Sequence, residues 1–535
     1  MNRQEPVIDA NAKPYKTLTE RVTLSWKELL GLKPAASPQE PTLGLEPESA
    51  VPPAAAPQVQ ASAPKGPEVT VPSADALAPK PFEPQPLVLS EEEKKAIKAQ
   101  TTRRKKGVLA GILVVNFLVL GYFKYWSHFA ALLSGAWAAS TPSALGLVMP
   151  LGISFYTFQA VGYLIDCYRG RHPAEKNFAR FLLFISFFPQ LVQGPINRYG
   201  ELEPQFMARH TWDWERTKRA LFLFAFGAMK KYAISNLTSP TIAAILDVED
   251  ASGLTGAMAL LAILLYSLQQ YADFSGGIDM VLGVAQLYDI QMMPNFRQPY
   301  FSTSLGDFWR RWHISLGAWM RDYLFYPFAL TKPMQRFGKW AAKHGGKHLG
   351  RVLPAAVANL LVFAVVGIWH GPEIHYLVWG LYNGAVIALS DLLEPAFKKL
   401  NAALHIPTES RAWHLFRILR TFVIVNIGWY FDRNGFMRGL FCLQKTFTDF
   451  RFDSLAANAP GAFAAVSGPA WGIVIISTIL VFVHSVLKEN GRDPYADVQR
   501  LPLVVRWALY YLVIFLTLIS FICVTDTTGF LYANF

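Results

Sequence analysis

A basic cluster and a long apolar run meet in Arg103-Arg104-Lys105-Lys106-Gly107-Val108-Leu109-Ala110-Gly111-Ile112-Leu113-Val114-Val115. Basic residues beside an apolar segment are typical of the cytoplasmic end of a membrane helix. Residues up to about 100 are polar and rich in Pro and Ala, whereas apolar runs recur from this point to the end of the chain. We therefore expect two regions: a disordered tail over 1–100 and a multi-span membrane domain over 101–535.

The composition supports a membrane protein, because 52% of the residues are hydrophobic and only 16% are charged. Roughly ten or more apolar segments approach the length that spans a bilayer. Several are broken by Gly and Pro, for example at Met149-Pro150-Leu151-Gly152. Broken spans are tolerated where protein or an internal cavity satisfies the freed backbone groups. The sequence predicts an all-α polytopic membrane protein whose tilted and re-entrant helices surround a cavity.

The charge pattern predicts an orientation. The net charge is +12, but the basic residues lie next to apolar runs, which favours a membrane topology and argues against a nucleic-acid partner. The segment Thr331–Arg351 is expected to be a cytoplasmic loop, since it has basic residues and no acidic one. The Pro/Ala-rich tail has the composition of a disordered chain, and the first residues lack the apolar core of a signal peptide. We expect the tail to be cytoplasmic and the run after Lys106 to be an internal signal-anchor.

Two histidines lie in unusual membrane segments. His313 lies in Asp307-Phe308-Trp309-Arg310-Arg311-Trp312-His313-Ile314-Ser315-Leu316, and His370 lies in Val365-Val366-Gly367-Ile368-Trp369-His370-Gly371-Pro372. A histidine in lipid is costly unless it faces protein or a water-filled path. Because imidazole titrates near neutral pH, it can also act as a base. Both residues are candidates for a functional site.

The segment around His313 has helical spacing. Trp309, Trp312 and His313 would share one stripe, and Asp307 would lie close enough to pair with the following arginines. An interfacial amphipathic helix explains the aromatic and basic residues equally well. That alternative does not require a histidine on the aromatic stripe.

His370 ends an apolar run at a predicted helix break. Gly371 permits close backbone approach, and Pro372 disfavours helical geometry at the residue before it. A histidine that only satisfies core packing is the alternative, and His484 is a second candidate that lacks the break. The three cysteines are far apart, and His344 with His348 lacks further ligands nearby, so we predict no metal site.

A base at membrane depth suits transfer of an acyl group from a thioester to a hydroxyl, because a hydroxyl needs a base to become a good nucleophile. The chain has no Gly-x-Ser-x-Gly, phosphate-binding P-loop or His-Glu-x-x-His motif. A transporter or flippase for a glycan precursor is an alternative. It is weakened because no internal repeat is evident.

At these residues the chain resembles the membrane-bound O-acyltransferase family, over roughly residues 107 to 535. The segments that carry the resemblance are Leu151–Gln159, Ser186–Leu191, Tyr271–Gly276, Asn295–Tyr300, Phe308–Tyr326 and Gly367–Gly371. The bacterial branch that it resembles includes alginate O-acetylases, peptidoglycan O-acetyltransferases and the teichoic acid D-alanyl-transfer protein.

This resemblance implies the roles of the site residues. His370 matches the family's catalytic base, and His313 matches a second position that helps to place or polarise the substrate. The family fold is a ring of tilted helices around a tunnel, with the acyl donor entering from the cytoplasm and the acceptor from the other face. A site in the middle of the membrane then requires a tilted or late-entering helix before His370, because a straight span from Arg351 would carry it well across the bilayer.

We therefore expect an O-acyltransferase of the bacterial inner membrane. It would transfer an acetyl-type group towards hydroxyls of an exported polysaccharide such as alginate or peptidoglycan, directly or through a periplasmic partner. No permanently bound cofactor is expected, and the donor would be an acyl thioester, either acetyl-CoA or an acyl-carrier protein. D-alanyl transfer from a carrier-protein thioester is the alternative, and the basic segment Thr331–Arg351 would attract either anionic donor.

Overall fold

The computed structural model describes residues 90–134, 150–191, 193–248, 253–523 and 529–530. Its helices are α2 (Glu91–Ser134), α3 (Ile153–Tyr168), α4 (Phe178–Ser186), α5 (Phe188–Leu191), α6 (Tyr199–Phe206), α7 (Trp214–Ala228), η3 (Met229–Asn236), α8 (Leu237–Leu246), α9 (Gly256–Leu287), η4 (Pro299–Phe301), α10 (Leu305–Arg311), α11 (Ile314–Met320), η5 (Arg321–Phe325), α12 (Tyr326–Ala329), α13 (Lys332–His370), α14 (Ile374–Leu392), α15 (Glu394–Ala403), α16 (Arg411–Arg433), α17 (Phe436–Thr448), α18 (Asp453–Phe463), α19 (Gly468–Glu489), α20 (Pro494–Gln499) and α21 (Leu503–Cys523).

The predicted all-α architecture is confirmed. In the described residues the only strand-like feature is an isolated bridge between Phe296 and Trp312. Four helices are long and apolar enough to cross a membrane, in α2, α13, α19 and α21, and the pair α14–α15, bent by 57°, would make a fifth. Several other apolar segments form short helices, such as α4 and α5, as expected for broken spans, whereas α9 and α16 are continuous helices of 32 and 23 residues. The chain is a multi-pass membrane protein.

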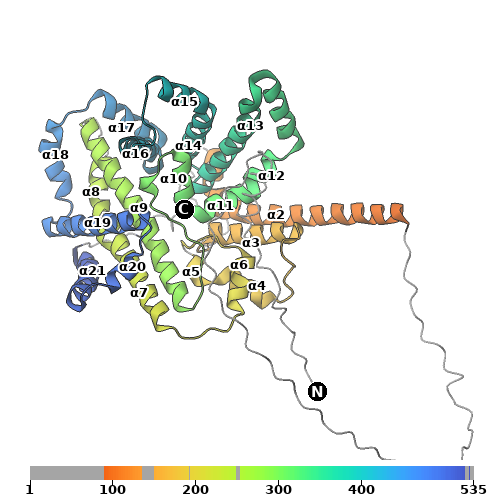
Figure 1. Cartoon of the computed structure of the whole chain (residues 1–535), viewed down its shortest axis with the longest axis horizontal. Helices are drawn as coiled ribbons and strands as arrows, with labels where there is room; N and C mark the ends of the chain where they lie inside the picture. The colour runs from red at the N-terminus through yellow and green to blue at the C-terminus, as the bar shows by residue number, and fades with distance from the viewer. Residues whose placement is uncertain (1–89, 135–149, 192, 249–252, 524–528, 531–535) are drawn as a thin grey trace, which may run out of the picture. The chain divides into compact units, whose positions relative to one another are not determined.

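Helix α9 forms the centre of the packing. Twenty of its residues are buried, and it packs against α7, α8, η3, α16 and α17 (Figure 1). Glycines let α7 and α9 approach closely: a Cβ on Gly276 would lie 2.7 Å from Gly227 O, which no side chain tolerates. A small-residue crossing of this kind is common between membrane helices, because it brings two backbones into contact.

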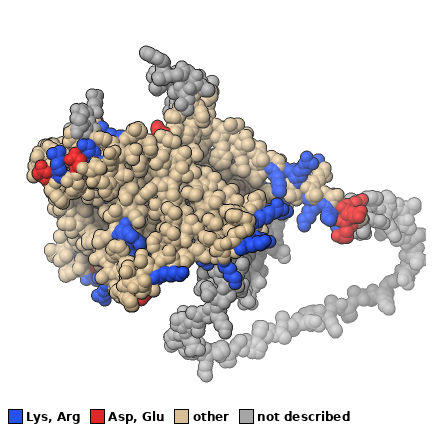
Figure 2. Space-filling model, turned by 90° about the horizontal axis from the view of Figure 1, so that it is seen from above, with Lys and Arg blue, Asp and Glu red and all other residues tan. Residues whose placement is uncertain are grey.

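The N-terminal tail, up to residue 89, is not among the residues that the structure describes. Residues 1–87 form a unit separate from Val88–Phe535, and the expected disorder concerns residues that the structure does not describe. Helix α2 begins at Glu91, inside the range expected for the tail, and runs as one straight rod (Figure 1). Its first turn is acidic and a basic stretch follows. Figure 2 shows these charges gathered at one end, beside a broad face with few charged side chains.

The basic segment Thr331–Arg351, for which the sequence suggested a loop, is helical. It forms the first arm of α13 and the turn into the second, and the turn is made by Gly346 with a φ of +83°. The two arms are antiparallel and close: a Cβ on Gly338 would lie 2.9 Å from Gly350 O, and one on Gly350 would lie 2.5 Å from Ala342 Cβ. Only glycine fits these positions, which fixes how the arms lie against each other.

Candidate active site

His370 lies at the point where α13 ends and α14 is about to begin. The predicted helix break is confirmed, because Gly371 is extended and its N–H makes only a long contact of 3.4 Å with Gly367 O. Gly367 also brings α14 close, since a Cβ there would lie 2.4 Å from Tyr376 O. The C-terminal end of α13 is therefore held by a backbone-to-backbone crossing with α14, and this crossing determines the position of the His370 imidazole.

Aromatic rings surround the His370 side chain, which is 3% exposed. The centroid of its ring lies 5.1 Å from that of Trp369, 4.9 Å from that of Trp379 and 6.1 Å from that of Tyr376. The Trp369 ring in turn contacts Phe155 of α3 at 6.0 Å. Such a shell excludes water and strengthens electrostatic interactions inside it.

Helix α2 contacts the same end of α13. Lys124 Nζ donates a hydrogen bond to Trp369 O, and Tyr125 Oη donates one of 2.6 Å to Ile368 O. These two side chains satisfy carbonyl groups that lack a partner at a helix C-terminus. We did not identify either residue from the sequence. A lysine near the end of the apolar run of α2 was the available clue, since charged residues in membrane helices usually have a specific partner.

The prediction of one continuous helix through His313 is wrong. Helix α10 ends at Arg311, and His313 has left-handed backbone angles (φ +47°, ψ +52°) before α11 begins. Asn295 explains the interruption, since its backbone O accepts from Ile314 N at 3.1 Å and its Oδ1 accepts from Ser315 N at 2.9 Å. A non-glycine residue with positive φ is costly and is found at functional sites where the surroundings enforce it.

The predicted pairing of Asp307 is confirmed. Its carboxylate lies 3.4 Å from Arg310 and 3.2 Å from Arg311. Arg311 also contacts Glu489 of α19 at 2.8 Å. This ion-pair group joins α10 to α19, and so it supports the helix that leads into His313.

The structure brings the two histidine segments together at Trp369. The His313 imidazole is 2% exposed, and its centroid lies 6.2 Å from that of Trp369, whose own centroid is 5.1 Å from that of His370. Phe274 of α9 closes the other side of His313, edge-on at 4.8 Å. The three residues His313, Trp369 and His370 are called the His–Trp–His cluster below.

A buried carboxylate lies behind this cluster. Asp432 of α16 is 6% exposed and accepts hydrogen bonds of 2.8 Å from Tyr266 Oη and from Gln270 Nε2. The preceding carbonyl, Phe431 O, lies 2.7 Å from His375 Nδ1. The end of α16 is thereby tied to α9 and to the start of α14. We did not single out Asp432 from the sequence, although an Asp within an apolar segment was a signal.

Buried ion pairs join η3 to α9. Lys231 Nζ lies 2.5 Å from Asp273 Oδ1, with both side chains at most 2% exposed, and Lys230 Nζ lies 2.6 Å from Asp279 Oδ2. Lys231 also donates to Gly529 O at 2.9 Å. Asp273 belongs to one of the segments that carried the family resemblance, but the ion pairs depend on contacts between distant parts of the chain.

The remaining histidines have other surroundings. The ring of His484 packs on Phe226 at 4.4 Å, away from the His–Trp–His cluster. His344 lies 2.8 Å from Trp340 O in the first arm of α13. Among the described residues, no group of three or more His, Cys, Asp or Glu is arranged to hold a metal ion.

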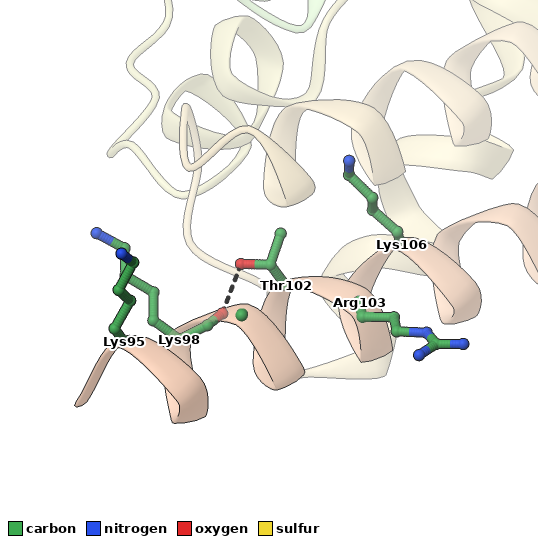
Figure 3. Close-up of a pocket in the computed structure, with 6 residues that line it drawn as sticks. Lys95, Lys98, Thr102, Arg103 and Lys106 are labelled. Carbon is green, nitrogen blue, oxygen red and sulfur yellow. Dashed lines mark hydrogen bonds between the residues drawn. The ribbon is translucent and has the colours of Figure 1, made fainter. Parts of the chain in front are cut away.

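Basic side chains lie at the opposite end of α2 from the cluster. A shallow groove on one face of this helix is lined by Lys95, Lys98, Ala99, Thr102, Arg103 and Lys106 (Figure 3). Within it, Thr102 Oγ1 donates to Lys98 O at 2.8 Å. From Lys106 to Lys124, which contacts the end of α13, the helix rises about 27 Å. The basic end of α2 and the residue that contacts the His–Trp–His cluster are therefore about 27 Å apart along the axis of this helix.

The comparisons with known proteins agree with this arrangement. The model of the membrane-bound O-acyltransferase family matches residues 171–408. The chain is 32% identical to a probable alginate O-acetylase of Pseudomonas syringae pv. tomato, over 74% of this chain and 72% of that protein. It is 31% identical to the peptidoglycan O-acetyltransferase of Helicobacter pylori, over 60% of each chain. It is 28% identical to the teichoic acid D-alanyltransferase of Bacillus subtilis, over 60% of this chain and 77% of that protein.

The matched region includes His313 and His370, the break after α13 and most of the helices that surround them. Together with the identity to the acetylase over nearly three quarters of the chain, this shows that the chain belongs to the membrane-bound O-acyltransferase family and is an O-acyltransferase.

Proposed function

We propose that this enzyme transfers an acetyl-type group from a cytoplasmic thioester towards hydroxyls of an exported cell-surface polysaccharide, with His370 as the catalytic base. The observation that carries the proposal is the His–Trp–His cluster, in which a buried imidazole lies at a helix break beside a second imidazole. The break leaves His370 at the end of a helix, where a substrate can reach it without unwinding α13.

The chemistry needs one base and one electrophile. His370 takes the proton of the acceptor hydroxyl while the hydroxyl oxygen attacks the thioester carbonyl carbon. The carbonyl π electrons move to the oxygen, and they return when the carbon–sulfur bond breaks. The leaving thiolate then takes the proton from His370, so the base is regenerated. His313 supports this step as a positioning residue for the substrate.

Basic side chains on α13 support an anionic thioester as the donor. Four cations of the first arm of α13 lie along one stripe at spacings of three and four residues, namely Lys332, Arg336, Lys339 and Lys343. All four are exposed, and none forms an ion pair with another described residue. Acetyl-CoA and acyl-carrier proteins are both anionic, so this stripe and the basic end of α2 would attract either donor.

The names of the relatives support a cell-surface polysaccharide as the acceptor. Two of them are named for O-acetylation of alginate and of peptidoglycan, which are cell-surface polymers. We infer that this enzyme lies in the bacterial inner membrane with its basic ends and its tail in the cytoplasm, as the positive-inside rule predicts. The immediate acceptor is then a polysaccharide hydroxyl or a side chain of a periplasmic partner that completes the transfer.

A second candidate is D-alanyl transfer from a carrier-protein thioester, which the teichoic acid D-alanyltransferase of Bacillus subtilis favours. The two candidates share the base and differ in the donor. Purified enzyme incubated with labelled acetyl-CoA, and separately with a D-alanyl-loaded carrier protein, distinguishes them. Label transferred only from the carrier protein would replace acetyl transfer by the second candidate.

The test of the base is His370→Ala in the full chain. We expect polymer acylation in cells to fall to background while the variant reaches the membrane at the wild-type level. His484→Ala is the matched control, since it removes a half-buried imidazole that lies outside the His–Trp–His cluster. Normal acylation by a stable His370→Ala variant would reject His370 as the base.

A further inference from the structure

The proposed reaction places negative charge on the thioester carbonyl oxygen, and enzymes usually stabilise such an oxyanion with hydrogen-bond donors that are already in position. If the proposed function holds, on which this inference rests, a group of this chain beside His370 must supply that donor.

The backbone around His370 offers acceptors rather than donors. His370 is at the C-terminus of α13, where carbonyl groups project and the helix dipole is negative. Three of these carbonyls already have partners, since Gly367 O accepts from Gly371 N, and Ile368 O and Trp369 O accept from α2 side chains. An oxyanion at this helix end therefore needs a side-chain donor.

The Trp369 indole has the required group. Its side chain is 4% exposed, and its ring centroid lies 6.2 Å from that of His313 and 5.1 Å from that of His370. Its Nε1–H has no hydrogen-bond partner among the described residues. Indole nitrogen is a donor only, and a buried donor without a partner costs free energy that the fold would ordinarily avoid.

We propose that Trp369 Nε1–H donates a hydrogen bond to the thioester carbonyl oxygen and stabilises it as it becomes an oxyanion. His370 removes the acceptor proton as the new carbon–oxygen bond forms, and the electron pair displaced from the carbonyl bond is held on the oxygen facing Trp369. When that pair returns, the carbon–sulfur bond breaks and the thiolate leaves with the proton from His370. Trp369 is thus a catalytic residue, and it does not change its protonation state.

Other donors nearby are less suitable. Lys124 is close to the Trp369 ring, but its ammonium group donates to Trp369 O. Asn295 Nδ2 also lacks a described partner, but this side chain holds the backbone after His313. Trp429 Nε1 lacks a described partner too. Its ring packs on Trp379 and on Trp312.

Trp369→Phe in the full-length enzyme tests this assignment, because it keeps an aromatic ring and removes the N–H group. We expect kcat to fall by about 100-fold, the size of effect seen when one oxyanion donor is removed. KM for the donor should stay within about twofold, since the lost interaction forms only in the transition state. Trp429→Phe is the matched control, as it removes a buried indole N–H in the same core cluster, and it should retain near-wild-type kcat.

A second measurement separates the N–H from ring packing. Incorporation of 3-benzothienylalanine at position 369 replaces N–H by sulfur with nearly the same shape, and it should reproduce the loss of kcat. The trifluoroacetonyl thioether of N-acetylcysteamine, whose hydrate mimics the tetrahedral intermediate, should inhibit both position-369 variants more weakly than wild type, by about the factor lost in kcat.

Wild-type kcat in the benzothienyl variant, or equal losses in the position-369 and position-429 variants, would overturn the inference. The activity of His370→Ala tests the proposed function independently of the Trp369 variants. An inactive His370→Ala variant beside a fully active Trp369 variant rejects only the oxyanion assignment, whereas an active His370→Ala variant rejects the proposed function itself.

Discussion

At the scale of single residues, the backbone of His313 depends on one amide. The left-handed conformation is held by Asn295, which bonds to Ile314 N through its carbonyl and to Ser315 N through its side chain. Asn295 Oδ1 also lies 3.4 Å from His313 Nδ1. The side chain of Asn295 therefore contributes to both the backbone and the ring orientation of His313.

Asn295→Ala should lower acyl transfer by about 10-fold or more and should destabilise the protein by about 1–3 kcal/mol, because Ser315 N loses a buried partner. Transfer rate and thermal unfolding of the detergent-purified variant measure the two effects. Asn490→Ala is a suitable control, since Asn490 also bonds to backbone but is exposed. Unchanged activity in Asn295→Ala would show that the orientation of His313 does not matter for the reaction.

The backbone at His370 could be predicted from the sequence, whereas the interruption of the helix at His313 could not, for a physical reason. Gly371 and Pro372 are local signals, so the helix break at His370 could be predicted from its immediate neighbours. The interruption at His313 depends on Asn295, which is separated from it by 18 positions. Helical periodicity depends only on local spacing. It therefore favoured a continuous helix at His313, although the long-range contact with Asn295 interrupts the helix there.

At the scale of helices, the crossing of α13 and α14 determines where the catalytic segment lies. Gly367 and Gly380 both form it, since a Cβ on Gly380 would lie 2.2 Å from Phe363 O. The sequence identified Gly367 only as a residue beside His370. Its role in helix packing could not be predicted, because the partner helix was unknown.

Gly367→Ala should force the two helices apart and displace His370, and we expect a loss of transfer larger than 10-fold together with a lower unfolding temperature. Gly472→Ala in α19 is the matched control, because a Cβ there would meet nothing within 4 Å. Thermal unfolding and transfer rate of the two variants in the same detergent make the comparison. Equal behaviour of the two variants would mean that α13 and α14 can separate without affecting the site.

At the scale of the whole molecule, the exposed basic clusters lie apart from the proposed site. They are found at the start of α2 and on the first arm of α13, whereas the His–Trp–His cluster is enclosed by aromatic rings and has Lys124 as a neighbouring cation. The sequence allowed us to predict this separation, because basic clusters and apolar runs are visible without a structure. The packing that brings α3, α9, α13 and α14 around one site was not predictable, since it consists of contacts between distant segments.

Neutralising the stripe on α13 tests its role in donor capture. The combined change of Lys332, Arg336, Lys339 and Lys343 to Gln should lower kcat/KM for the donor at low ionic strength, while kcat stays near wild type. The difference from wild type should shrink as salt is added, because screening weakens the attraction. The change of Lys398 and Lys399 to Gln in α15 serves as the control. A salt-independent loss would instead indicate a folding defect.

The antiparallel hairpin of α13 has a consequence for the path length of each substrate. A Cβ on Gly338 would also lie 3.1 Å from Pro354 Cγ, so Lys332, about 9 Å further back along the first arm, lies near the level of Leu360 on the second arm. If Lys332 reaches water or lipid headgroups, the membrane boundary also reaches that level, and only about 15 Å of helix remain before His370. That is half of the roughly 30 Å hydrocarbon thickness, so thioester and acceptor would each cross one leaflet and meet halfway.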